Sequence, residues 1–384
     1  MIDLLVVSHA CFTAINRNVY HLLEKDNWNL EIVVPKTLLF ASGEKTAEPP
    51  QPADPPLHYL NLKGNNPRTY LFESLMELLD QKRPRIILLD NDPVSRLSIR
   101  LGKWCKKNNA WLFCISNENL SLDISSAINR RGWKAMPAAI IKRIMLKESR
   151  NLVDGVFTVN RDGERLFKAA GYHNVRFMPL GFDPAYFYPD AGSRQQIRDR
   201  LALKEKVISY FGRLTREKGI HILIGALAEL KSYSWQLMMD SFDPSTSAYH
   251  AEINQLLKNA GIAERVVFIN PSHTEIAAYM NAADLIVVPS ITIPAWKEQY
   301  GRVAAEAMAC GKTVIASKSG ALPGLLNGHG YLFEEGDVVA LAGILKNFLS
   351  PGGNGHLSEP DIAAYALENL SINTQKAVLE AAFR

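Results

Sequence analysis

The amino-acid sequence predicts an α/β protein made of two doubly wound domains that face each other across a cleft. Short apolar runs alternate with amphipathic segments along the whole 384-residue chain, a pattern typical of parallel strands joined by helices. The length fits about two domains. A stretch punctuated by Pro and Gly, residues 179–184, interrupts the alternation near the middle and predicts the junction between the domains.

Amino-acid composition and charge limit the classes of function that the protein can have. Residues 1–185 hold 25 basic and 19 acidic side chains, which suits an anionic partner such as a phosphate or a membrane surface. No basic run is interleaved with aromatic residues, so we expect no nucleic-acid partner. The four cysteines are scattered without a C-x-x-C pair, which favours reduced thiols and argues against a metal centre. We expect no transmembrane helix and no signal peptide, and therefore a cytoplasmic location.

The first half contains apolar runs rich in Val, Ile, Leu and Phe, as expected for strands buried on both faces. The predicted strands are 2–7, 30–34, 57–60, 85–89, 111–115, 155–159 and 175–178. Helical patterns over 69–80 and 94–107 separate some of them, and 41–56 reads as an exposed loop.

The second half repeats this alternation. Its predicted strands are 206–211, 235–239, 265–269, 284–288 and 312–316, and its predicted helices are 219–231, 249–260, 274–282, 300–310 and 338–349. We therefore expect an N-terminal domain over 1–184, a C-terminal domain over 185–358, and a last helix within 359–384 that packs back on the N-terminal domain. Ligands of such sheets bind beyond the carboxyl ends of the strands.

A candidate phosphate site follows the first strand of the C-terminal domain. Gly212 permits a sharp turn, and the planar guanidinium of Arg213 suits a phosphate group. Lys218 lies at the start of the next helix, where a bound anion is favoured. A solvent-exposed basic turn with Thr215 as the helix cap is the competing interpretation.

Two carboxylates eight residues apart form a second candidate site. Glu306 lies among small apolar residues within a helix, so its carboxylate is expected to be buried and to need hydrogen-bond donors, which the two hydroxyls of a ribose provide. Glu298 precedes that helix and is placed to accept hydroxyls of a second sugar. Gly301 exposes the helix N-terminus to a diphosphate between them. These three binding positions would hold a sugar, a diphosphate and a ribose in that order, which is the order of the groups in a nucleotide sugar.

These segments resemble a known donor-binding signature. Gly212-Arg213-Leu214, Glu217-Lys218-Gly219, the Glu298-x7-Glu306 pair and residues 317–324 are similar to retaining family 4 glycosyltransferases. That family has the GT-B fold, with two Rossmann-like domains. The amino-acid sequence of residues 296–302 resembles that of a branch of bacterial polysaccharide-assembly enzymes.

The resemblance implies a role for each matching residue. Arg213 and Lys218 would bind the donor diphosphate. Glu306 would bind the ribose, and Glu298 would bind the transferred sugar. The expected catalytic residues are therefore Arg213, Lys218 and Glu298. The residues expected to bind the donor are Gly212, Arg213, Lys218, Glu298, Tyr300, Gly301, Arg302 and Glu306. The donor is a substrate, so no cofactor is expected.

Acceptor-side candidates follow strands of the N-terminal domain, where the sequence departs from the family pattern. They are His9, Asn16, Asp92, Glu118 and Asn119. A structural or solvent-exposed histidine is the alternative for His9, and capping of the helix after Pro93 is the alternative for Asp92.

The segment 130–150 is rich in basic and large apolar residues. Such a composition suits a helix lying on anionic lipid at the inner face of the cytoplasmic membrane, and the alternative is an ordinary amphipathic helix packed on its own domain.

The sequence thus predicts a retaining, metal-independent glycosyltransferase. It would move a sugar from a nucleotide diphosphate sugar to a glycan or lipid-linked acceptor in bacterial surface or extracellular polysaccharide synthesis. The alternatives are a catalytically inactive sugar-nucleotide-binding or scaffold protein and, third, an epimerase or phosphorylase of the same fold.

Overall fold

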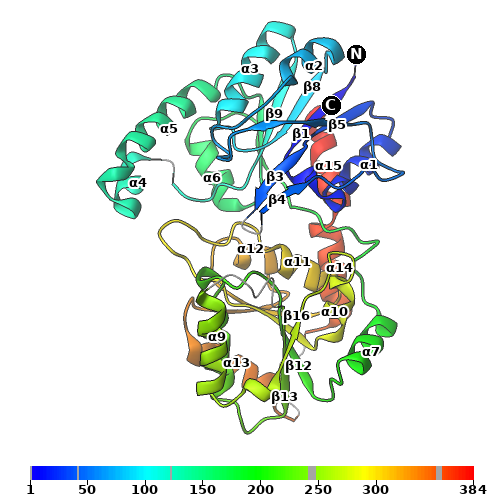
Figure 1. Cartoon of the computed structure of the whole chain (residues 1–384), viewed down its shortest axis with the longest axis vertical. Helices are drawn as coiled ribbons and strands as arrows, with labels where there is room; N and C mark the ends of the chain where they lie inside the picture. The colour runs from blue at the N-terminus through cyan, green and yellow to red at the C-terminus, as the bar shows by residue number, and fades with distance from the viewer. Residues whose placement is uncertain (1, 41–42, 122, 241–247, 352–356) are drawn as a thin grey trace. The chain divides into compact units, whose positions relative to one another are not determined.

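A computed structural model describes residues 2–40, 43–121, 123–240, 248–351 and 357–384. The chain divides into two compact units. The N-terminal unit comprises 1–181 and 372–384, and the C-terminal unit comprises 182–371. Each unit holds a parallel β-sheet with helices packed on it (Figure 1), which confirms the predicted α/β class with two doubly wound sheets.

The N-terminal sheet has seven parallel strands in the order β11-β10-β9-β8-β1-β2-β5. They are β1 (Leu4–Ser8), β2 (Leu30–Pro35), β5 (Leu57–Leu60), β8 (Ile86–Asp90), β9 (Trp111–Ser116), β10 (Gly155–Thr158) and β11 (Val175–Phe177). Every strand predicted in this half is found in it. The strand order reverses direction between β1 and β8, so the two chain segments that follow these strands diverge and leave room for a ligand.

The C-terminal sheet has six parallel strands in the order β14-β13-β12-β15-β16-β17. They are β12 (Lys206–Tyr210), β13 (Trp235–Asp240), β14 (Val266–Ile269), β15 (Leu285–Val288), β16 (Thr313–Ser317) and β17 (Tyr331–Phe333). The predictions missed only β17, which is too short to show a pattern of its own. The order reverses between β12 and β15, the two strands that precede the predicted donor residues.

Helices cover these sheets. They are α1 (Asn18–Lys25), α2 (Leu75–Lys82), α3 (Arg96–Asn108), α4 (Ile124–Arg131), α5 (Met136–Ser149), α6 (Arg161–Ala169), α7 (Ala191–Arg200), α8 (Ile220–Ala228), α9 (Ala248–Asn259), α10 (Ile276–Ala282), α11 (Arg302–Ala309), α12 (Leu322–Leu326), α13 (Val338–Leu349), α14 (Glu359–Leu370) and α15 (Ile372–Phe383). Among the residues that the structure describes, no helix is both long enough and apolar enough to cross a bilayer.

The structure differs from the sequence prediction in other places as well. Residues 71–72 of the predicted helix 69–80 form the short strand β7 (Leu71–Phe72), which pairs antiparallel with β6 (Leu62–Lys63), so α2 starts only at Leu75. Part of the predicted loop 41–56 forms strand β4 (Gly43–Thr46), which pairs antiparallel with β3 (Thr37–Phe40), and residues 41–42 lie outside the described part. The segment 359–384, predicted as one helix, forms two, because Ser371 adopts an extended backbone between them. Of these, α14 belongs to the C-terminal unit and α15 to the N-terminal unit.

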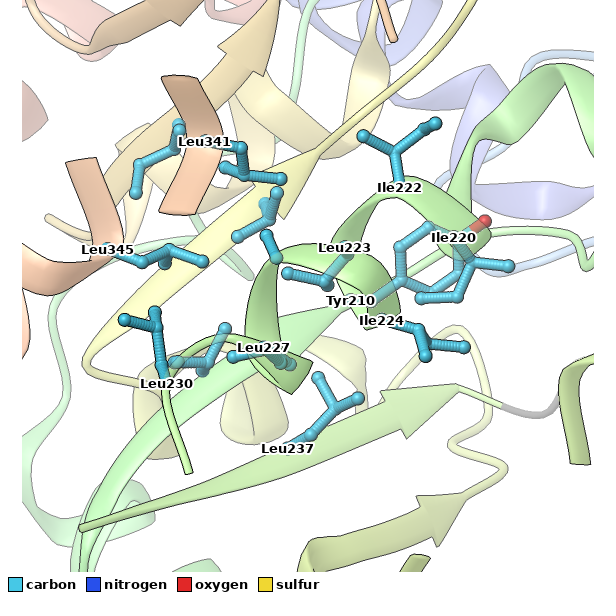
Figure 2. Close-up of a cluster of buried hydrophobic side chains, with 14 of the residues drawn as sticks. Tyr210, Ile220, Ile222, Leu223, Ile224, Leu227, Leu230, Leu237, Leu341 and Leu345 are labelled. Atoms are coloured by element: carbon cyan, nitrogen blue, oxygen red, sulfur yellow. The ribbon is translucent and has the colours of Figure 1, made fainter. Parts of the chain in front are cut away.

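Helix α8 is fixed by a hydrophobic core, and this matters because the predicted phosphate site lies at its start. Leu223 and Leu227 of α8 pack beside Leu341 and Leu345 of α13 and are fully buried (Figure 2). Leu237 of β13 belongs to the same cluster. Burying each leucine contributes about 2 kcal/mol, so the position of the helix start is set by packing on the sheet.

Candidate active site

The candidate active site lies at the switch point of the C-terminal sheet, beyond the ends of β12 and β15. The turn after β12 ends at Gly219, whose backbone φ of +70° is in the left-handed region. A Cβ atom at Gly219 would stand 1.8 Å from the carbonyl oxygen of Pro289, which follows β15. The backbone N–H of Ile291 donates to the carbonyl of Glu217 at 2.8 Å. The two turns therefore touch along their backbones, and only glycine permits this approach.

Lys218 and Glu298 meet at this point. The Nζ atom of Lys218 lies 2.7 Å from Oε2 of Glu298, and the same oxygen accepts the hydroxyl of Ser290 at 2.8 Å. The exposed fractions of the lysine and glutamate side chains are 21% and 8%. The ring of Trp296 covers the ammonium at 4.7 Å from its centroid. The structure thus brings two predicted catalytic residues together in one half-buried ion pair.

The loop that carries Glu298 is held by the turn after β16. The backbone carbonyl of Glu298 accepts the N–H of Ala321 at 3.0 Å, and its N–H donates to the Ser319 hydroxyl at 3.5 Å. A Cβ atom at Gly320 would stand 2.0 Å from the Glu298 carbonyl oxygen. This close backbone contact orients the carboxylate of Glu298 toward Lys218.

Gly301 and Glu306 are placed by helix α11. Gly301 is the residue before the helix, with φ of +90°, and a side chain there would meet Leu322 at 2.6 Å. Glu306 is buried within α11, with 9% of its surface exposed. Within the part of the chain that the structure describes, its carboxylate accepts no hydrogen bond. Burial raises the pKa of Glu306 to about 7, against the opposing charge of Arg302.

Tyr300, next to Gly301, is buried, and its hydroxyl finds no partner among the described residues. Burial raises the pKa of this hydroxyl above its ordinary value. An unpaired buried donor is costly. Tyr300 just before α11 and Glu306 in the middle of the helix thus carry two polar groups whose hydrogen-bonding capacity the described residues do not use.

Arg213 and Gly212 occupy the turn directly after β12. Gly212 has a φ of +142° and Arg213 is exposed. The Tyr210 hydroxyl donates to the Arg213 carbonyl at 2.8 Å. Burial raises the pKa of Tyr210 well above its ordinary value, and the charges of both Glu298 and Arg213 act on it. Arg213 forms no ion pair within the described residues, so its role at a diphosphate stays a prediction. The alternative interpretation holds in part: Arg213 is exposed, and Thr215 takes the position before the 3-10 helix Arg216–Lys218, but the Thr215 side chain makes no capping hydrogen bond.

Ser290 is a site residue that the sequence predictions missed. Its side chain is fully buried. Its position just after β15, where ligands of a parallel sheet bind, is the sequence feature that could have identified it. Replacing Ser290 by alanine is expected to lower the rate of sugar transfer about fivefold, because Glu298 loses one orienting hydrogen bond of about 1 kcal/mol. Ser209→Ala in β12 is the matched control, since that buried hydroxyl has no partner in the described structure. Equal rates for the two variants in a transfer assay would remove Ser290 from the site.

The acceptor-side candidates lie in the N-terminal unit, at the corresponding switch point. The carboxylate of Asp90, at the end of β8, accepts the Ser8 hydroxyl at 2.7 Å, and its carbonyl oxygen lies 2.9 Å from Nδ1 of His9. Asn16 donates to the Ala10 carbonyl at 2.8 Å. These bonds support a structural part for His9 and Asn16, and a contact of either with an acceptor remains a prediction.

Asp92 and Glu118 form a charged cluster at the ends of β8 and β9. Glu118 pairs with Arg68 at 2.7 Å and with Lys142 at 3.0 Å, while the Ser116 hydroxyl bonds to Asp92. Burial and the charge of Glu118 raise the pKa of Asp92. Burial opposes the charge of Glu118, but Lys142 and Arg68 outweigh it and lower its pKa.

The cap of helix α3 is not Asp92. Ser95 accepts the N–H of Ser98 at 3.2 Å and fills this position, so the capping alternative for Asp92 is wrong. Asn119 is buried beside Glu118. The structure therefore gathers three of the five acceptor-side candidates, Asp92, Glu118 and Asn119, at neighbouring strand ends.

Part of the chain is similar in sequence to known proteins. Residues 193–358 match the family described as "Glycosyl transferases group 1". The D-inositol 3-phosphate glycosyltransferase of Mycobacterium ulcerans (strain Agy99) is 34% identical over 210 residues, which cover 52% of this chain and 43% of the relative. The enzyme of that name from Corynebacterium jeikeium (strain K411) is 33% identical over 183 residues, or 44% of this chain and 42% of the relative. The matches thus span less than half the length of these relatives.

Solved structures resemble the chain over its whole length. Sucrose-phosphate synthase from Thermosynechococcus elongatus is 21% identical, with a TM-score of 0.73 and coverage of 100% of this chain and 98% of that one. Anabaena HepE in complex with UDP-glucose is 18% identical, with a TM-score of 0.72 and coverage of 99% of each chain. The protein therefore has the two-domain GT-B fold of these structures, and its residues 193–358 are similar to the group 1 glycosyl transferase family.

Proposed function

We propose that the protein is a retaining, metal-independent glycosyltransferase that moves a sugar from a nucleotide diphosphate sugar to a glycan or lipid-linked acceptor. The observation that carries this proposal is the convergence of Lys218, Glu298 and Ser290 at the β12–β15 switch point, on a loop that leads into α11 and its buried Glu306. We place the reaction in the cytoplasm, in bacterial cell-surface or extracellular polysaccharide synthesis.

The diphosphate of the donor binds between Lys218 and the N-terminus of α11. An ammonium group has three N–H donors, so Lys218 keeps its bond to Glu298 while donating to a phosphate oxygen. Helix α11 starts at Arg302, and the positive end of a helix dipole attracts an anion. Arg213, exposed after β12, supplies a second cation, and Gly212 and Gly301 keep both turns close to the ligand.

Two carboxylates bind the hydroxyl groups on either side of the diphosphate. Glu306 accepts the two ribose hydroxyls, which satisfy a buried carboxylate that has no other donor in the described structure. Glu298 accepts hydroxyls of the transferred sugar. Tyr300, whose buried hydroxyl has no partner among the described residues, lies just before α11 and completes the donor site.

In the transfer step the bond between the sugar C1 and the β-phosphate oxygen breaks, and a bond from C1 to the acceptor oxygen forms on the same face. The leaving diphosphate takes the proton of the acceptor hydroxyl. Lys218 and Arg213 stabilise the charge that develops on the leaving group, and a fixed donor at such a charge contributes about a hundredfold or more to the rate. The acceptor binds along the N-terminal unit near His9, Asn16, Asp92, Glu118 and Asn119.

A panel of nucleotide sugars tests this proposal, with UDP-glucose first because HepE binds it. One member is expected to raise the melting temperature, since a ligand at a hundred times its Kd stabilises the native state by about 2.7 kcal/mol. The same compound should release nucleoside diphosphate in the presence of EDTA, with retention at C1 by NMR. Stabilisation without any release would support the binding or scaffold protein instead, and a panel without any shift would contradict both.

A further inference from the structure

Helix α5 and the turn before it carry a group of exposed apolar side chains in the N-terminal unit. The exposed fractions are 76% for Trp133, 38% for Met136, 43% for Ile140, 57% for Ile141 and 62% for Ile144. We call these five residues the α5 patch. Single exposed apolar residues are common, but a contiguous group of this size indicates an interaction surface.

Cations surround the α5 patch. Lys134, Arg143 and Lys147 are exposed, and none of them forms an ion pair within the described residues. A shallow hollow at the same place is lined by Ile140, Ile144, Arg143 and Lys147, together with Arg150 and the acidic Asp123. Hydrogen bonds from neighbouring serine hydroxyls keep the carboxylate of Asp123 ionised, but the three cations Arg143, Lys147 and Arg150 outnumber it, so the charge of this hollow is mainly positive.

The opposite face of α5 is fixed to the rest of the unit. Ala139 and Ser149 are buried, Met145 and Leu146 pack against the hydrophobic core, and Lys142 pairs with Glu118 at 3.0 Å. Glu148, four residues after Ile144, lies beside the patch and pairs with Lys103 of α3 at 2.7 Å. Figure 1 shows α5 beside α3 and α4 in the N-terminal unit. These contacts decide which way the helix faces, and they leave the apolar side chains and the three cations outward. Lys142, although it belongs to the basic run 130–150, takes part in the inward contact and not in the patch.

We propose that the α5 patch docks on the surface of an anionic lipid bilayer. Large apolar side chains next to Lys and Arg, with Trp at the edge, fit the boundary between acyl chains and negatively charged headgroups. A protein partner fits less well, because lysine is depleted at protein–protein interfaces. The inference concerns a surface of the N-terminal unit and does not rest on the donor site.

Flotation with lipid vesicles tests the proposal. The full chain is expected to float with vesicles of phosphatidylcholine and phosphatidylglycerol, and much less with phosphatidylcholine alone or at high salt. Ile144→Ser should lower the partition coefficient about tenfold through lost apolar burial, and Arg143→Ser about fivefold through lost attraction to the headgroups. Val339→Ser, a matched control at an 80% exposed position of α13, should bind like the wild type.

Three results would overturn the inference. One is equal binding of the wild type and both α5 variants to anionic vesicles. Another is equal binding to both kinds of vesicle, and the third is a light-scattering mass above the 42.8 kDa of one chain that falls to this value in Ile144→Ser, which would make the patch an interface between two copies. Donor hydrolysis in the absence of vesicles should be unchanged in Ile144→Ser, so failure of the donor proposal is recognised separately.

Discussion

Replacing Lys218 by methionine is expected to lower the rate of sugar transfer about a hundredfold or more. The methionine keeps the length of the side chain but removes the cation that faces the diphosphate, and a charge-assisted bond to phosphate contributes about 1.5–3 kcal/mol. Stabilisation of the leaving group in the transition state adds to this loss. The loss should appear mainly in kcat, measured by release of nucleoside diphosphate, because the new charge develops during the reaction.

The same substitution also removes the ion pair between Lys218 and Glu298. The Glu298 carboxylate is 8% exposed and retains its hydrogen bond from the Ser290 hydroxyl. Because the lysine is itself partly exposed, we expect a loss of about 1–2 kcal/mol in the free energy of unfolding, less than for a fully buried pair. Thermal unfolding measures this loss and shows that the variant is folded when its activity is tested.

Arg216→Met is the matched control for Lys218→Met. Arg216 lies two residues earlier in the same turn, but it pairs with the exposed carboxylate of Glu252 at 2.8 Å. Its loss should change the transfer rate by less than about twofold, since an exposed pair contributes little. Similar rates for the two variants would mean that positive charge near α8, and not the position of Lys218, supports the reaction, and the proposed donor site would then be wrong.

The sequence was sufficient to predict that the candidate donor residues lie at one edge of the C-terminal sheet, since this placement depends on strand order. Gly212 and Lys218 follow one apolar run, and Glu298 follows another, so residues that act together had to end at one edge of a parallel sheet. The pairing of Lys218 with Glu298 was not predictable, because these residues are separated by 80 positions. The pairing depends on the backbone contact of Gly219 with Pro289 and of Gly320 with Glu298, which no periodicity reports.

The other features that the sequence did not predict also depend on contacts between distant segments of the chain. The basic pattern of 130–150 predicted a charged helix, but only the fold shows that Lys142 turns inward to Glu118 while Arg143 stays exposed. The break between α14 and α15 at Ser371 depends on a bridge between Ser371 and Phe182, which are far apart in the sequence. Local patterns predicted most strands, and contacts between distant segments determined the rest.

Glu306→Gln is expected to weaken donor binding and, at pH 8, to stabilise the protein. Burial raises the pKa of Glu306 from 4.5 to about 7 in the native state. Between these values the native protein binds more protons than the unfolded chain, so stability falls as pH rises through this range. The cost of the ionised form reaches about 3 kcal/mol above pH 8, and the neutral glutamine does not incur it.

Two measurements separate this prediction from a simple packing effect. In thermal unfolding, the stability of Glu306→Gln relative to the wild type should increase by about 2.5 kcal/mol between pH 5 and pH 8, because all other titrating groups are common to both proteins. In steady-state kinetics, the KM of the wild type for the donor should rise about tenfold from pH 8 to pH 6, since the ribose hydroxyls require an ionised acceptor whose pKa is about 7. The variant should have a high KM that hardly changes with pH.

A stability difference that is the same at both pH values would show that the carboxylate is not desolvated, and a normal KM in the variant would show that Glu306 does not hold the ribose. Because the carboxylate destabilises the empty protein above neutral pH, retaining it there makes physical sense only if a ligand supplies the missing hydrogen bonds.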